Sequence, residues 1–97
     1  MKEYDYIIRL YDYYSELLTV RQRKYFEAYY FNNYSLSEIA DNFNISRNAI
    51  YKAIKAVDGK LMLYESKMCL CKKRKRLEEI VKVIDDEDVK NELMNMY

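Results

Sequence analysis

The feature that most constrains this chain is its lack of turn-forming residues: it has 97 residues, no proline and one glycine, Gly59. Hairpins and sheets depend on these residue types, because other residues adopt tight-turn backbone angles only at a cost. Helices need neither type in their interiors. We therefore expect one all-α domain over residues 1–97, and an apolar content of 51% is sufficient to form its core.

The first expected helix covers residues 5–18, where apolar residues recur every three or four positions. The residues on this face are Ile7, Tyr11, Tyr14 and Leu18, with Ile8, Leu10 and Leu17 beside them.

Two capping boxes follow, at residues 19–22 (TVRQ) and 35–38 (SLSE). In each box the hydroxyl accepts a backbone N–H, and the side chain three residues later bonds back. The helix that the second box begins is expected to end at Asn44, because asparagine tolerates the left-handed conformation of a sharp corner. Ser46 is then the expected N-cap of a fourth helix.

Two short capped helices joined by a three- or four-residue turn are the arrangement of a helix-turn-helix motif. We assign the motif to residues 19–57, with Ala40 at the closest approach of its two helices. The residues expected to be buried in it are Leu36, Ile39, Ala40, Ile45 and Ile50.

The fourth helix is expected to be long and to pass through Gly59 to about Leu70, since one interior glycine costs only about 1 kcal/mol relative to alanine. Its apolar residues follow a heptad repeat, which we call the seam: Ile50, Ile54, Val57, Leu61, Tyr64, Met68 and Cys71. Two shorter helices are expected to complete the C-terminal extension of residues 58–97. Their apolar residues are Leu77, Ile80, Val81 and Ile84 in the first, and Val89, Leu93 and Met96 in the second.

The motif region resembles known families. The "SLSEIA…ISR" core is similar to region 4 of bacterial sigma-70 factors, which reads promoter −35 elements, and residues 8–70 resemble the YlxM family of small bacterial proteins. Asn48 and Ala56 depart from that family's pattern, in which glutamine follows "SR" and a basic residue follows "IK". Genes of the family typically lie beside the gene for the protein component of the signal recognition particle, so the resemblance implies a regulatory part in that pathway.

The composition disfavours catalysis. The chain has no histidine, and with a single glycine it has no phosphate-binding loop. We expect no enzyme activity, no cofactor and no metal site, with Cys69 and Cys71 as reduced thiols. No apolar run is long enough for a membrane span and the first ten residues carry charges, so we expect a cytoplasmic protein that has no contact with membranes.

Charge is unevenly distributed along the chain. The net charge is −2 over residues 1–20, +3 over 21–60, +5 over 61–76 and −5 over 77–97. The basic run at 72–76 (KKRKR) attracts phosphate in DNA or RNA without reading sequence. It is also suited to neutralising the acidic tail, within one molecule or across a dimer.

The beginning of the fourth helix is the candidate nucleic-acid interface. Arg47, Tyr51 and Lys55 share one face, with Asn48 and Lys52 beside them. Such a face offers a guanidinium to guanine, an amide to adenine and ammonium groups to phosphates. The alternative is a solvated helix face with no partner.

Three basic residues at the start of the second helix are candidates to hold the DNA backbone: Arg21, Arg23 and Lys24. Three functions remain open on the sequence. The first is a dimeric DNA-binding regulator, and the second is an accessory factor that contacts the signal recognition particle through its RNA or protein. The third is a scaffold that binds only proteins, which the low net charge of +1 keeps open.

A homodimer is expected from the length of the seam. Its second half, from Leu61 to Cys71, lies beyond the helix-turn-helix region and has no evident partner in the chain. Pairing there would place two recognition helices on successive turns of DNA. The alternative is that the first C-terminal helix folds back and covers the seam.

Overall fold

The computed structural model describes residues 2–96, which contain helices joined by short connections and no strand. The prediction of an all-α fold is confirmed. The elements are α1 (Lys2–Tyr14), the 3₁₀ turn η1 (Ser15–Leu17), α2 (Val20–Tyr30), α3 (Leu36–Phe43), α4 (Arg47–Met68), α5 (Leu70–Val81) and α6 (Glu87–Met94).

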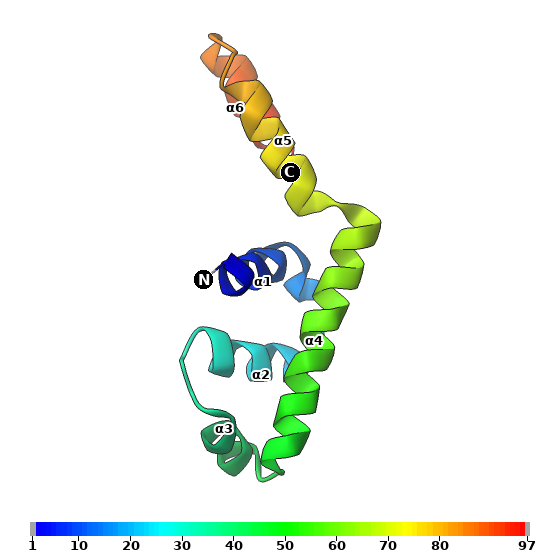
Figure 1. The fold of residues 1–97 in the computed structure, drawn as a ribbon. Coiled ribbons are helices and arrows are strands. Elements are labelled where there is room, and N and C mark those ends of the chain that lie inside the picture. The colour runs from blue at the N-terminus through cyan, green and yellow to red at the C-terminus, as the bar shows by residue number, and fades with distance from the viewer. Residues whose placement is uncertain (1, 97) are drawn as a thin grey trace.

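The long helix α4 forms the spine of the molecule, and α1, α2 and α3 lie along one side of it (Figure 1). Beyond the end of α4, helices α5 and α6 pack on each other and project away from the rest. The molecule is therefore elongated, with extents of 54 × 24 × 23 Å. We call residues 2–68 the head and residues 70–96 the arm.

Both predicted capping boxes are formed. Gln22 N donates to Thr19 Oγ1 at 3.1 Å, and Thr19 N donates to Gln22 Oε1 at 2.9 Å. The box at residues 35–38 has the same two distances, and its hydrogen bonds to Ser35 lower the pKa of Glu38. These contacts satisfy N–H groups that the first turns of α2 and α3 leave unpaired.

The turn between α3 and α4 also follows the prediction at two of its residues. Asn44 is left-handed, with φ of 56°, and Ser46 Oγ accepts the N–H of Ala49 at 3.0 Å. Ile45 differs from the prediction, because its side chain is 36% exposed. Ile45 N donates to the carbonyl of Ala40 at 3.0 Å, so backbone hydrogen bonding closes the corner and the side chain is only partly covered.

The core consists of two clusters along α4. The cluster nearer the start of α4 joins α2, α3 and α4 through Tyr25, Ile39, Ala40, Ile50 and Ile54. The other cluster joins α1, α2 and the second half of α4 to the start of α5, through Ile7, Leu10, Tyr11, Tyr14, Leu18, Phe26, Val57, Leu61 and Cys71.

The first helix ends earlier than predicted, at Tyr14 instead of Leu18. It stops at Tyr14 and continues as η1, which has three residues per turn. This change of period directs Leu17 away from the core, and its side chain is 52% exposed. The four residues of the predicted face are buried as expected.

The long fourth helix passes through Gly59, as predicted, but ends at Met68. Cys69 is left-handed, with φ of 56°, and Cys71 belongs to α5. A straight helix drifts by about 20° per heptad relative to a strict seven-residue repeat. The buried face therefore includes Asp58 and Glu65, whereas Met68 is 37% exposed.

The expectation that the second half of the seam lacks a partner in the chain is wrong. Leu61 has no exposed surface, because it packs in the cluster that contains Ile7 and Tyr14 of α1. Helix α1 therefore covers this part of α4, and the first C-terminal helix does not fold back over it. The seam is unavailable as the dimer interface inferred from the sequence.

Candidate nucleic-acid interface

The first half of α4 separates buried apolar residues from exposed polar ones. Ile50 and Ile54 face the core, with 0% and 3% exposure. The five candidate residues on the remaining faces are all exposed, as predicted: Arg47, Asn48, Tyr51, Lys52 and Lys55. We call these five residues the recognition face.

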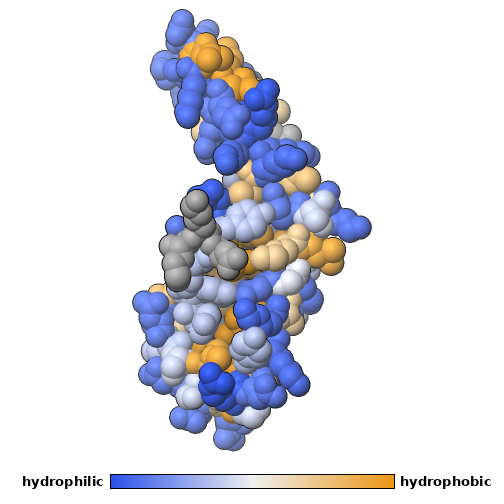
Figure 2. Space-filling model, viewed as in Figure 1, coloured by the Kyte–Doolittle hydropathy of each residue, from blue (hydrophilic) through white to orange (hydrophobic). Residues whose placement is uncertain are grey.

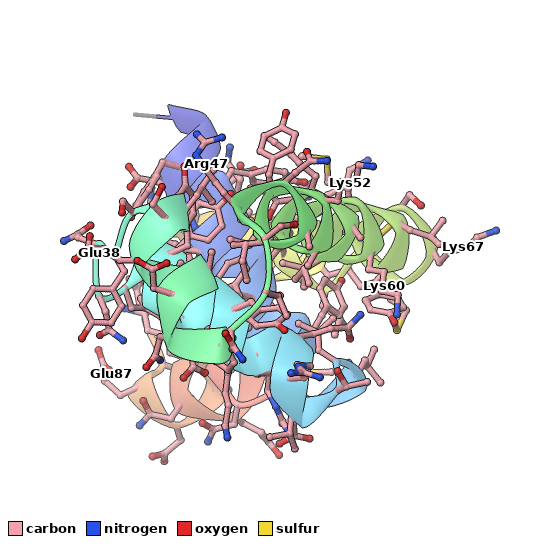
Figure 3. The ribbon with its side chains drawn as sticks, turned by 90° about the horizontal axis from the view of Figure 1, so that it is seen from below. Glu38, Arg47, Lys52, Lys60, Lys67 and Glu87 are labelled. Atoms are coloured by element: carbon pink, nitrogen blue, oxygen red, sulfur yellow. The ribbon has the colours of Figure 1, made fainter. Side chains whose placement is uncertain are left out.

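The recognition face is cationic and carries one aromatic ring. No acidic residue occurs between Asp41 and Asp58, so Arg47 and Lys52 have no carboxylate within five residues, whereas Lys55 lies three residues before Asp58. Lys55 Nζ lies 5.8 Å from the centre of the Tyr51 ring, and this ring is 47% exposed. Figure 3 looks at the beginning of α4 and shows Arg47 and Lys52 projecting outwards.

The three candidate backbone contacts lie on a different helix, near the beginning of α2. Arg21 and Lys24 are exposed, and Arg23 is half-buried. The guanidinium carbon of Arg21 lies 5.8 Å from the centre of the Tyr25 ring. The start of α2 occupies the lower part of Figure 3, away from Arg47 and Lys52 in the upper part. The structure therefore does not gather the eight candidate residues into one cluster.

A cleft of about 870 Å³ opens between α1, α2 and α4, beside the recognition face. Tyr51 and Lys55 form part of its lining, together with Tyr4, Tyr30 and Asp58. This cleft was not predicted from the sequence, because the residues that line it come from separate helices. Two residues of the recognition face thus also border a concave surface.

Asp58 is the most unusual residue of the cleft, since only 9% of it is exposed. Its Oδ2 accepts the hydroxyl of Tyr30 at 2.8 Å, whereas Oδ1 is buried and has no hydrogen-bond partner among the described residues. Burial raises the pKa of Asp58 above its ordinary value of 3.8, although the Tyr30 hydrogen bond and the charge of Lys55 act in the opposite direction.

The raised pKa of Asp58 makes the stability of the fold depend on pH. The contribution of protonated Asp58 to the free energy of unfolding is fully present at pH values below its unfolded-state pKa. This contribution is lost as the pH rises through the higher folded-state pKa. Asp58→Asn cannot ionise, so the difference in unfolding free energy between variant and parent should shift in favour of the variant as pH rises from about 4 to 7. Urea titrations across this range measure the difference. A constant difference would show that Asp58 does not titrate in this way.

A second buried carboxylate, Glu65, joins the head to the arm. Its Oε1 accepts the Tyr14 hydroxyl at 2.6 Å and the N–H of Cys71 at 3.1 Å, and its Oε2 accepts the N–H of Lys72 at 3.1 Å. The N–H of Leu70 donates to the Tyr14 oxygen at 2.9 Å. Glu65 and Tyr14 therefore cap the beginning of α5 from outside that helix. Burial, followed by the hydrogen bond to Glu65, raises the pKa of Tyr14 to about 12.

Neither buried carboxylate was predicted from the sequence, although the spacing of both contained a signal. Asp58 follows Ile54 by four residues, and Glu65 follows Leu61 by four. On a straight helix both acids therefore lie on the apolar ridge rather than on the solvent face. An acidic residue at such a position indicates a buried hydrogen-bonding network.

The chemistry of the described residues is otherwise limited. Cys69 is half-buried, Cys71 is buried, and both are free thiols. Burial raises the pKa of Cys71. Within residues 2–96, no three cysteine, aspartate or glutamate side chains gather in a way that suits a metal ion. No helix in this range combines the length and apolar character needed to cross a bilayer.

Comparison with known proteins places the chain in a family. Residues 1–96 match the model of the UPF0122 family, described as "Putative helix-turn-helix protein, YlxM / p13 like". A UPF0122 protein of Bacillus pumilus is 44% identical over 73 residues, which are 75% of this chain and 66% of that protein. A relative from Halalkalibacterium halodurans is 40% identical over 89 residues, covering 88% of this chain and 82% of the relative.

A third UPF0122 protein, from Listeria welshimeri, is 38% identical over 86 residues, which cover 89% of this chain and 78% of that protein. The match thus extends well beyond the helix-turn-helix motif and into the C-terminal arm. The chain belongs to the UPF0122 family of YlxM-like helix-turn-helix proteins.

Proposed function

We propose that this protein is a cytoplasmic DNA-binding regulator without enzyme activity, and that the recognition face enters the major groove. The observation that carries the proposal is the exposure of all five residues of the recognition face on the helix that follows the turn at residues 44–46. The second helix of such a motif is the one that reads base edges in known helix-turn-helix proteins.

The side chains of the recognition face suit different parts of DNA. Arg47 has the planar donors that pair with guanine, and Asn48 has the donor and acceptor that pair with adenine. Lys52 and Lys55 are point charges suited to phosphates. Arg21, Arg23 and Lys24 approach from another helix, where they suit backbone contacts that fix orientation without reading sequence.

An accessory role at the signal recognition particle, through its RNA or its protein component, is the second candidate. The observation that favours it is the basic run at residues 72–76, in which Lys72, Lys73, Lys75 and Arg76 are exposed. Exposed cations attract the phosphates of RNA as well as those of DNA, without reading sequence. This run lies in the arm, away from the recognition face, so the two candidates rest on separate surfaces.

The test replaces two cations of the recognition face, Arg47→Ala with Lys55→Ala, and measures binding to a selected DNA site over a range of salt concentrations. The matched control, Lys60→Ala with Lys67→Ala, removes the same charge from the second half of α4, where both residues are exposed. We expect the recognition-face variant to lose about 100-fold in affinity and all sequence preference. The slope of log affinity against log salt should fall by about 2, whereas the control should bind nearly as tightly as the parent.

Three other outcomes would contradict the proposal. If the recognition-face variant kept full and sequence-selective affinity, the DNA-binding site would lie on another surface. Selection of structured RNA in place of DNA, with loss on changing residues 72–76, would favour the second candidate. Binding to neither nucleic acid would leave a scaffold that acts through protein contacts.

We also propose that the protein acts as a homodimer. Helix-turn-helix proteins are commonly two-fold dimers, and two-fold homodimers are the commonest oligomers of soluble proteins.

A further inference from the structure

The arm buries too little apolar surface to be stable by itself. Helices α5 and α6 have 12 and 8 residues, and isolated helices of this length are marginal in water. Among the described residues of the arm, only Leu77 is buried apart from Cys71, which packs against the head. One further contact between its helices is a hydrogen bond from Arg74 Nη1 to the carbonyl of Met94. The arm therefore requires additional cover.

Apolar side chains remain exposed on the arm at the positions where such cover would lie. Ile80 and Val89 are each 41% exposed, Met96 is 62% exposed and Val83 is 82% exposed. Figure 2 shows apolar side chains gathered near the outer end of the arm, within an otherwise hydrophilic surface. A contiguous patch rimmed by polar residues marks an interaction surface.

Charge distinguishes the two ends of the arm. The end next to the head carries the basic run at residues 72–76, which we call the base. The outer end carries four consecutive acids at residues 85–88, which we call the tip. Eight residues separate the two runs, and the first five of them, residues 77–81, complete α5. The exposed Ile80 lies between them.

We propose that the arm pairs with the arm of a second copy in antiparallel orientation, so that the base of each chain faces the tip of the other. This inference deepens the homodimer of the proposed function by assigning its interface, and it does not depend on DNA binding. The two-fold axis passes near Ile80, and the exposed apolar side chains of both arms meet across it to form a four-helix bundle.

A second copy fits the arm better than an unrelated partner does, because each arm carries both a basic run and the acidic run that this basic run would attract. In a two-fold dimer, residue i of one chain contacts residue j of the other, and j contacts i. The antiparallel arrangement therefore forms the base-to-tip attraction twice. A parallel arrangement would set base against base and tip against tip, and juxtaposed like charges are strongly unfavourable.

Pairing through the arms has a consequence for DNA binding. The heads lie at opposite ends of the paired arms, and a single chain is already 54 Å long. The two recognition faces are then farther apart than one turn of DNA, about 34 Å. Such a dimer engages two separate sites or two duplexes, in contrast to the sequence-based expectation of binding on successive turns.

Charge reversal tests the interface, with sedimentation equilibrium of the full chain in the absence of DNA as the measurement. The base variant replaces four of the five cations of the run at 72–76 by glutamate, at Lys72, Lys73, Lys75 and Arg76. The tip variant replaces three of the four acids of the run at 85–88 by lysine, at Asp85, Glu87 and Asp88, and keeps Asp86 as the cap of α6. Each should raise the dimer dissociation constant by about 100-fold, because like charges then face each other at both ends. Mixing the two variants should restore a dimer of one copy of each, and combining both sets of substitutions in one chain should restore the homodimer, because opposite charges then face each other again at both ends.

Two single substitutions distinguish dimerisation through the arm from dimerisation through α4. Ile80→Asp should give a monomer whose helix content is unchanged in the head, whereas Leu63→Asp, at an exposed position on α4, should leave the dimer intact. A parent protein that is monomeric at about 100 μM, a concentration well above typical specific dimer affinities, would overturn the proposal. Dimers in both reversed variants, or dissociation by Leu63→Asp alone, would also overturn it. All of these results are independent of whether the protein binds DNA.

Discussion

Ala40→Arg is expected to lower the free energy of unfolding by about 3 kcal/mol or more. Ala40 is 4% exposed and lies where α3 meets α4, in contact with the cluster that contains Ile50 and Ile54. An arginine at this position must displace the two helices or bury its charge, and both are costly. The loss would disrupt the turn that orients the recognition face.

The control for this substitution is Asp41→Arg, which adds the same side chain at the neighbouring, exposed position of α3. Surface changes of this kind usually alter stability by less than about 0.5 kcal/mol. Urea denaturation followed by circular dichroism gives both values. Equal denaturation midpoints for the Ala40 variant and the parent would show that α3 and α4 do not pack as described.

Glu65→Ala is expected to lower the free energy of unfolding by about 3–4 kcal/mol. It removes the acceptor of three hydrogen bonds, from the Tyr14 hydroxyl and from the N–H groups of Cys71 and Lys72. A buried donor without a partner costs about 1–3 kcal/mol. The beginning of α5 loses its cap as well, so hydrogen exchange should become faster in the arm than in the head.

Two further variants assign the origin of the Glu65 effect. Tyr14→Phe keeps the acid but removes one donor to Glu65 and the acceptor of the Leu70 N–H, so it should cost about 2 kcal/mol, less than Glu65→Ala. Glu78→Ala removes an exposed glutamate from α5 and should cost less than about 0.5 kcal/mol. If Glu65→Ala were as mild as Glu78→Ala, the buried network would not hold the arm to the head.

Local signals in the sequence were sufficient to predict the helix-turn-helix region. The capping boxes at 19–22 and 35–38 are contacts between residues three apart, so they form wherever a helix begins there. Asn44 and Ser46 act at the corner in the same local way. Because these caps fix where α3 and α4 begin, helical spacing then predicts that Ile39, Ala40 and Ile50 are buried, as they are.

The end of α4 could not be predicted, because distant residues determine it. Cys69 is left-handed, a conformation that its side chain does not favour. The chain turns there so that the next N–H groups reach Glu65 and Tyr14, and Tyr14 precedes Leu70 by 56 residues. A regular heptad pattern continues through this break, so periodicity alone favoured a longer helix and a misplaced dimer interface.

The candidate interface was predictable in part. Exposure of the recognition face follows from helical period once Ile50 and Ile54 are assigned to the core. The cleft beside it was not predictable, since it depends on how Tyr4 of α1 and Tyr30 of α2 meet α4. That the recognition face binds a nucleic acid, and which one, stays a prediction.

The most direct test of the proposed DNA binding is to crosslink the protein in living cells and sequence both the DNA and the RNA recovered with it. The parent should recover a small set of DNA sites that share a motif, and Arg47→Ala with Lys55→Ala should abolish this enrichment while Lys60→Ala with Lys67→Ala retains it. Recovery of RNA of the signal recognition particle without enriched DNA sites, or DNA enrichment that survives the loss of Arg47 and Lys55, would contradict binding through the recognition face.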